Sequence, residues 1–153
     1  MPADVIAQVW CTPAAIGAYF VATVIRIVLA YRIRMGTILL AGSILIDMAL
    51  LYSLIWSFHL QYMQPASFYL KAPTQQYVYI FIAMRALRFE VRYVVLAGLA
   101  AALGWLAMVG YAISANPGDS MITRDYIHYM TSNSVLLGAE FDKIITILAV
   151  TTI

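Results

Sequence analysis

The sequence predicts an all-α protein: a polytopic transmembrane helical bundle with four full spans, a truncated fifth span and an interfacial helix on the non-cytoplasmic side. Of its 153 residues, 64% are hydrophobic and 10% are charged, whereas soluble domains average about 25% charged residues. The apolar residues also fall in runs long enough to cross a hydrocarbon core, which takes about 20 helical residues. One bundle covering residues 1–153 is therefore expected, without a separate soluble domain.

The first two spans are expected at 13–31 and 37–58, on either side of a basic turn at 32–34. Pro13 suits a helix start, because the N–H that proline lacks is not needed in the first turn. The second span carries one charged residue, Asp47, near its middle. This pair of spans would form an antiparallel hairpin.

The third span, 77–90, is short because arginines follow closely, and the fourth, 93–113, contains no charged residue. Within the fourth span, small side chains recur at the spacing that lets helices approach closely in lipid. They form a predicted helix-packing face of Ala97, Gly98, Ala101 and Gly104. Packing inside the bundle and a dimer face both fit this pattern.

Two polar loops, 59–76 and 114–142, separate the later spans, and the second contains the turn sequence at 116–119. Aromatic and polar residues at 120–134 predict an interfacial helix. The fifth span, 143–153, covers about half of a hydrocarbon core, so we expect the natural protein to continue beyond Ile153. Residues 1–12 are too short and too polar to add a span.

The charges predict the orientation of the bundle in a bacterial inner membrane. One side holds six arginines offset by Glu90 alone, whereas the other holds three basic and five acidic residues. An excess of arginine in short loops marks the cytoplasmic side. The basic loops are therefore expected in the cytoplasm, the loops 59–76 and 114–142 in the periplasm, and the fifth span is expected to run inward. The net charge of +2 is too small to favour a nucleic-acid partner.

Asp47 is the sharpest polar anomaly, since a carboxylate at the centre of a span costs about 2.5–3.5 kcal/mol unless it is paired or protonated. Arg26 and Arg85 lie on neighbouring spans at depths from which they could pair with it. An intramembrane ion pair that fixes the packing is the first interpretation. A proton or ligand relay in a small transporter is the alternative.

Other chemistry is sparse in this sequence. His59 and His128 fall on the periplasmic side near several carboxylates, but their spacing matches no metal-ligand motif, so no metal site is predicted. Cys11 is the only cysteine, and the catalytic motifs that we considered are absent. No catalytic residue and no cofactor are therefore assigned to this chain.

Several stretches resemble the membrane region of bacterial class III adenylate/guanylate cyclases. They are residues 46–51, 55–62, 64–73, 85–90, 122–126 and 138–144. The resemblance implies a six-helix unit followed by a cytoplasmic linker helix and a catalytic domain. That domain dimerises and converts ATP to cyclic AMP and pyrophosphate with two divalent metals, Mg²⁺ or Mn²⁺.

The chain departs from this family in two ways, because it lacks the first membrane helix and everything after the middle of the last one. The metal-binding aspartates of the family have no counterpart here. The leading hypothesis is therefore a membrane-anchoring, signal-receiving domain that forms a homodimer together with the missing catalytic domain. The alternative is a non-catalytic accessory subunit docked to a larger photosynthetic or respiratory complex.

Overall fold

A computed structural model shows an all-helical chain. It describes residues 3–32, 36–87, 90–115 and 122–152, apart from the side chains of residues 3–12, 15, 26 and 29–31. The helices are α1 (Ala3–Arg32), α2 (Thr37–Gln61), α3 (Phe68–Lys71), α4 (Gln75–Ala86), α5 (Val91–Ala115), α6 (Tyr126–Thr131) and α7 (Leu137–Thr152). The described part of the chain contains no strand, only an isolated bridge between Ile122 and Val135.

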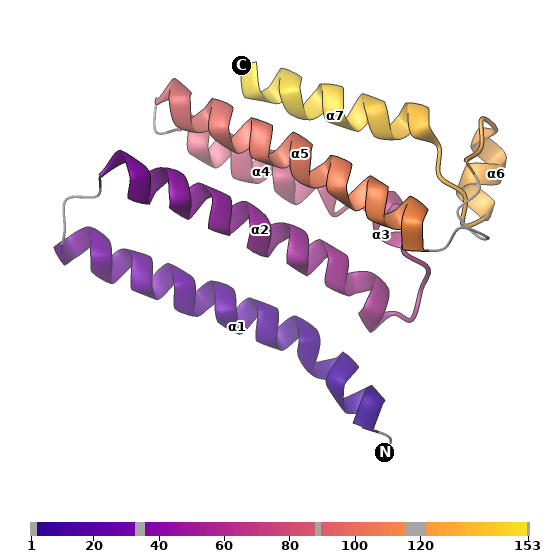
Figure 1. Ribbon diagram of the computed structural model, residues 1–153, viewed down its shortest axis with the longest axis horizontal. Coiled ribbons are helices and arrows are strands. Elements are labelled where there is room, and N and C mark those ends of the chain that lie inside the picture. Colours follow the sequence, from indigo (N-terminus) through magenta and orange to yellow (C-terminus); the bar gives the residue numbers. More distant parts are fainter. Residues whose placement is uncertain (1–2, 33–35, 88–89, 116–121, 153) are drawn as a thin grey trace.

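Helix α5 is the centre of the bundle and packs against α2, α4 and α7, while α1 packs on α2. In Figure 1, α1, α2, α5 and α7 lie side by side, and α6 lies beyond the end of α5. Helix α7 runs back from this α6 end towards the opposite end of the bundle, and its Thr151 lies beside Gly98 of α5. Helices α1 and α4 end, and α2 and α5 begin, at that second end. We call it the basic end, because the sequence has arginines between these helices.

Two helices, α2 and α5, are long enough and apolar enough to cross a membrane. Each has 25 residues, or about 37 Å of helix. Helix α4 has 12 residues, about 18 Å, and α7 has 16, about 24 Å. The four full spans expected from the sequence thus reduce, on length and apolarity, to two candidate spans.

Three boundaries differ from those predicted for the spans by more than three residues. Helix α1 begins at Ala3, so Pro13 lies inside a helix and does not start one. Helix α4 ends at Ala86, four residues before the predicted end of the third span. Helix α7 begins at Leu137, six residues before the predicted start of the last span. Charged residues at 88–92 and 140–143 obscured the last two of these boundaries in the sequence, because charges next to an apolar segment resemble a loop.

The short helices α3 and α6 lie at the end of the bundle where α4 and α7 begin. Helix α2 ends at Gln61, followed by Met63 in the left-handed region with φ 51°. Pro65 cannot continue the helix, and the chain turns inward. Tyr69 and Leu70 on α3 are then fully buried, so this segment is part of the core.

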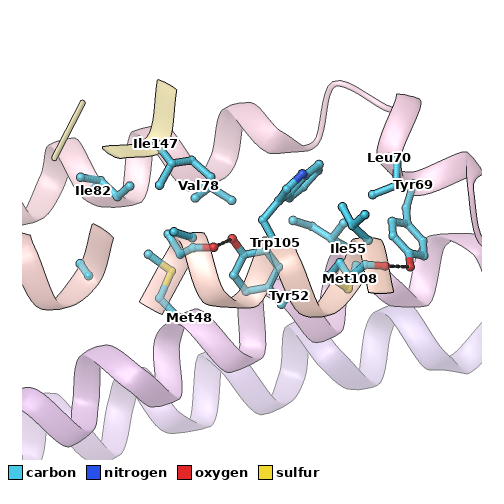
Figure 2. Packing of buried hydrophobic residues seen from close by; sticks show 14 of the residues in the cluster. Met48, Tyr52, Ile55, Tyr69, Leu70, Val78, Ile82, Trp105, Met108 and Ile147 are labelled. Carbon is cyan, nitrogen blue, oxygen red and sulfur yellow. Dashed lines mark hydrogen bonds between the residues drawn. The ribbon is translucent and has the colours of Figure 1, made fainter. Parts of the chain in front are cut away.

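Tyrosine hydroxyls on neighbouring helices hold α5 in the core (Figure 2). Tyr52 on α2 donates to the carbonyl oxygen of Ala101 at 2.5 Å, and Tyr69 on α3 donates to that of Met108 at 2.7 Å. Trp105 lies between them and has no exposed surface. Each hydroxyl is therefore buried together with an acceptor, as a polar group in an apolar core requires.

The small residues of α5 make these approaches possible. Ala97 and Ala101 are fully buried. A Cβ atom on Gly98 would lie 1.9 Å from Oγ1 of Thr151 on α7, and one on Gly104 would lie 2.3 Å from Cε2 of Tyr52 on α2. The predicted helix-packing face therefore contacts helices of the same chain.

Candidate functional site

The centre of the candidate site is Glu140, a carboxylate in the first turn of α7 that is 2% exposed. It accepts a hydrogen bond from Nε1 of Trp105 at 2.9 Å. It also forms an ion pair with Nζ of Lys143 at 2.8 Å, one turn further along α7. Burial of a charge costs free energy unless it is paired and hydrogen-bonded, and here both conditions are met.

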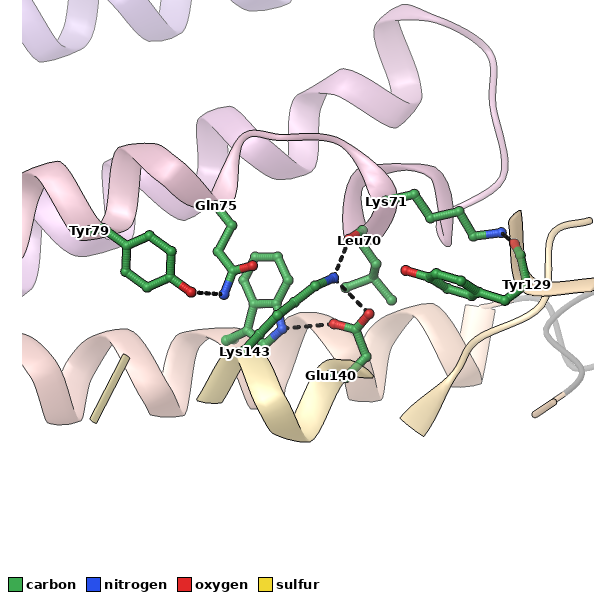
Figure 3. A network of polar contacts seen from close by, with 8 residues as sticks. Leu70, Lys71, Gln75, Tyr79, Tyr129, Glu140 and Lys143 are labelled. Atoms are coloured by element: carbon green, nitrogen blue, oxygen red, sulfur yellow. Dashed lines mark hydrogen bonds and ion pairs between the residues drawn. The ribbon is translucent and has the colours of Figure 1, made fainter. Parts of the chain in front are cut away.

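Lys143 extends this arrangement to α3, as Figure 3 shows. Its Nζ donates to the carbonyl oxygen of Leu70 at 2.5 Å and lies 5.2 Å from the centre of the Trp105 ring. An ammonium over the face of an indole ring is attracted by the ring quadrupole. The start of α7 is thus held to both α3 and α5.

Lys71, next to Leu70 in the chain, is bonded to the end of α6. Its Nζ donates to the carbonyl oxygen of Tyr129 at 2.5 Å and to that of Ser132, and it lies 4.6 Å from the centre of the Tyr129 ring. The last carbonyls of a helix have no partner within the helix, and a lysine near them stabilises that end. Lys71 therefore fastens α6 onto α3.

The charges on these helices influence one another. Burial lowers the pKa of Lys71, and the nearby Glu140 opposes that shift. Burial also raises the pKa of Tyr129 to about 12, with a further contribution from the charge of Glu140. Since Lys71 lies on α3 and Tyr129 on α6, the carboxylate on α7 acts on both short helices.

The segment that carries α6 has its own internal bonds. Asp125 caps the helix by accepting from the backbone N–H of Ile127 at 2.9 Å. The backbone N–H of Thr123 donates to the carbonyl oxygen of Val135 at 3.0 Å and closes the base of the segment. We call residues 122–135 the cap segment, because it covers the α6 end of the bundle as one unit.

The cap segment and α4 carry further polar contacts beside this network. Gln75 at the start of α4 donates to the hydroxyl of Tyr79 at 2.8 Å (Figure 3). Nδ1 of His128 lies 3.1 Å from the hydroxyl oxygen of Ser132. Together with the contacts of Lys71 and Lys143, they place polar side chains on four elements, α3, α4, α6 and α7.

The second charged pair joins Asp47 and Arg85, as the sequence suggested. The nearest atoms are 2.5 Å apart, and the side chains are 1% and 13% exposed, respectively. The guanidinium of Arg85 also lies 4.8 Å from the centre of the Phe81 ring. The side chain of Arg26, the other proposed partner, lies outside the described residues.

The two histidines do not share partners. His59 packs against the rings of Trp56 and Tyr69 with centroids 5.1 and 5.7 Å apart, whereas His128 contacts serines of the cap segment. Among the described residues, no three His, Cys, Asp or Glu side chains are close enough together to hold a metal ion.

Sequence reasoning missed the role of Glu140, which it assigned to a periplasmic loop. The usable signal was Trp105, because an indole N–H in the middle of an apolar helix needs an acceptor. The missed residues Lys71, Tyr129 and Lys143 complete the network, which we call the Glu140 network and define as Lys71, Trp105, Tyr129, Glu140 and Lys143.

No protein-family model, curated protein or solved structure matches this chain. The geometry itself must therefore support any functional interpretation. The Glu140 network joins α3, α5, α6 and α7 through one ion pair and several hydrogen bonds. Such a network can couple a displacement of the cap segment to the position of α7.

Proposed function

We propose that this chain is the membrane-anchoring and signal-receiving domain of a bacterial class III adenylate cyclase. In this proposal α2 and α5 cross the membrane, with α1 packed on α2 and with α4 and α7 packed on α5. The basic end lies in the cytoplasm and the α6 end in the periplasm. The catalytic domain, with its Mg²⁺ or Mn²⁺ ions, would belong to the parent protein and follow α7.

The course of α7 is the observation that carries the proposal. This helix starts in the Glu140 network, next to the cap segment, and runs towards the basic end. Loops rich in arginine favour the cytoplasmic side. A signal received at the α6 end would therefore have a direct helical route to a cytoplasmic domain.

The residues that carry the family resemblance also pair with one another. Asp47 and Arg85 come from two of the resembling stretches and form the buried ion pair. Lys143 and Leu70 come from two others and are joined by a hydrogen bond. The resembling stretches thus supply two of the contacts that join helices, which fits a structural role for these stretches.

The mechanism requires two packing states of the bundle, with a signal that binds one better than the other. The Glu140 network offers a physical basis for two states. In one state α7 would be held to α5 by Glu140 and to α3 by Lys143; in the other these two contacts would be broken and the first turn of α7 released. A shift or rotation of α7 would then change the register of a cyclase dimer.

The accessory-subunit alternative needs a face for docking to a larger complex. The small-residue face of α5 was its candidate, but Gly98 and Gly104 of that face already contact Thr151 and Tyr52 within the chain. Purification in mild detergent separates the two hypotheses, because an accessory subunit would co-elute with its complex in fixed stoichiometry.

The proposal is tested by expressing the natural gene to its own stop codon and assaying the product for conversion of ATP to cyclic AMP with Mg²⁺ or Mn²⁺. We expect cyclic AMP formation by the full-length protein. A stop codon shortly after Ile153 with no cyclase domain downstream would contradict the proposal.

A further inference from the structure

A cavity of about 360 Å³ lies between α1, α2 and α4, away from the Glu140 network. Its walls include Leu51, Leu54 and Phe58 on α2 and Phe81 on α4, and Asp47 also lines it. Ligand sites in proteins are typically concave, mostly apolar and supplied with a few polar groups. The cavity has this character.

The cavity has the length of one bilayer leaflet if α2 crosses the membrane as proposed above. Asp47 is ten residues from the start of α2, about 15 Å along the helix axis, which is the middle of a core about 30 Å thick. Phe58 is eleven residues further on, or about 16 Å. The cavity therefore runs from the bilayer midplane towards the periplasmic interface.

The cavity is open along one side to the surroundings of the bundle. Among its lining residues, Tyr19 on α1 is 46% exposed, and Tyr77 and Met84 on α4 are 54% and 62% exposed. At this depth the surroundings are lipid, so an occupant must dissolve in the membrane and enter sideways. The walls fit a hydrocarbon chain.

The inner end of the cavity has different chemistry. The carboxylate of Asp47 is 1% exposed and is held by Arg85 at 2.5 Å. An ionised carboxylate only accepts hydrogen bonds, and it repels a second anion. Asp47 and not Arg85 lines the cavity, so a group that donates a hydrogen bond is favoured at this end over a second carboxylate.

We propose that this cavity binds a membrane-soluble ligand with a linear hydrocarbon body about one leaflet long and a hydroxyl or amino group directed at Asp47. Long-chain alcohols and amines belong to this class. The inference rests on the membrane placement in the proposed function and not on the cyclase domain.

Dodecanol is a suitable probe, measured by its effect on the melting temperature of the protein in lipid nanodiscs. Ligand that binds only the folded state raises this temperature in a saturable manner. We expect saturation with dodecanol, and an affinity at least about tenfold weaker for dodecane and for dodecanoate, which lack the hydroxyl or carry a negative charge.

A matched pair of variants tests the location. Leu51→Trp fills the cavity and should weaken dodecanol binding at least about tenfold, whereas Leu99→Trp should change it less than about twofold. Leu99 lies on α5, is 51% exposed and does not line the cavity. Both substitutions add the same bulk to a helix surface.

Three results would overturn the inference: no saturable effect of dodecanol, equal affinity for all three probes, or binding that Leu51→Trp leaves unchanged. The assay uses no nucleotide, so its outcome is separate from that of the cyclic AMP assay. A chain that makes no cyclic AMP could still bind dodecanol, and a cyclase could fail to bind it.

Discussion

Replacement of Glu140 should lower stability in two graded steps. Glu140→Gln keeps an oxygen that can accept from Trp105 but removes the ion pair with Lys143, which is 21% exposed and retains its bond to Leu70. Because this pair is partly solvated, we expect a loss of about 1–2 kcal/mol in the free energy of unfolding.

Glu140→Leu removes both interactions and leaves the indole N–H of Trp105 and the ammonium of Lys143 without their acceptor. Breaking a buried pair on one side typically costs about 3–5 kcal/mol, because the other charge stays buried. We expect a loss near the lower end of that range, since Lys143 keeps the carbonyl oxygen of Leu70.

The assay is reversible unfolding in micelles, followed by tryptophan fluorescence in a Trp10→Phe, Trp56→Phe background that leaves Trp105 as the reporter. Asp142→Asn is the matched control, because this carboxylate is exposed on the same helix and should change stability by less than about 0.5 kcal/mol. If Glu140→Leu were as stable as the control, the ion pair and the hydrogen bond to Trp105 would not hold α7.

Three further predictions follow from other contacts. Gly104→Leu should destabilise the bundle by about 1–3 kcal/mol or more, because its Cβ would meet the ring of Tyr52. Gly110→Leu is the control in the same thermal unfolding measurement, and it should be tolerated because no atom lies within 4 Å of a Cβ at that position. Lys71→Met should speed amide hydrogen exchange in α6 by about tenfold, because that helix loses its C-terminal donor; unchanged exchange would show that Lys71 does not fasten the cap segment. Tyr129 keeps its proton in the folded protein up to about pH 12, above its ordinary pKa of 10.0, so the stability it contributes is complete below pH 10 and is lost as pH rises to about 12. Tyr129→Phe should reduce that loss of stability, and a difference titration of tyrosinate absorbance should show a missing group near pH 12.

The sequence predicted the helical class because apolar runs and charge content can be read along the chain without knowing any long-range contact. It also predicted one long-range pair, since a carboxylate in the middle of a span needs a cation and Arg85 was at a suitable depth. The same reasoning offered Arg26 equally, and nothing in the spacing could choose between them. Helix orientation in three dimensions decides such a pairing.

Apart from the need of Trp105 for an acceptor, the Glu140 network could not be predicted, for a physical reason. Three charged residues within 140–143 look like a solvated loop, and only the burial of Glu140 by α5 turns them into the first turns of a helix. The contacts of Lys71 are to backbone carbonyls of residues about sixty positions away. Carbonyl acceptors exist at every residue, so sequence carries no signal for them.

The most direct test of the central claim is cyclic AMP formation in membrane vesicles from cells that express the natural gene to its stop codon. We expect inside-out vesicles to convert added ATP to cyclic AMP, because in the proposed topology α7 leads to the cytoplasmic face. We expect sealed right-side-out vesicles not to do so. Absence of cyclic AMP from inside-out vesicles, or its formation in right-side-out vesicles, would contradict the account.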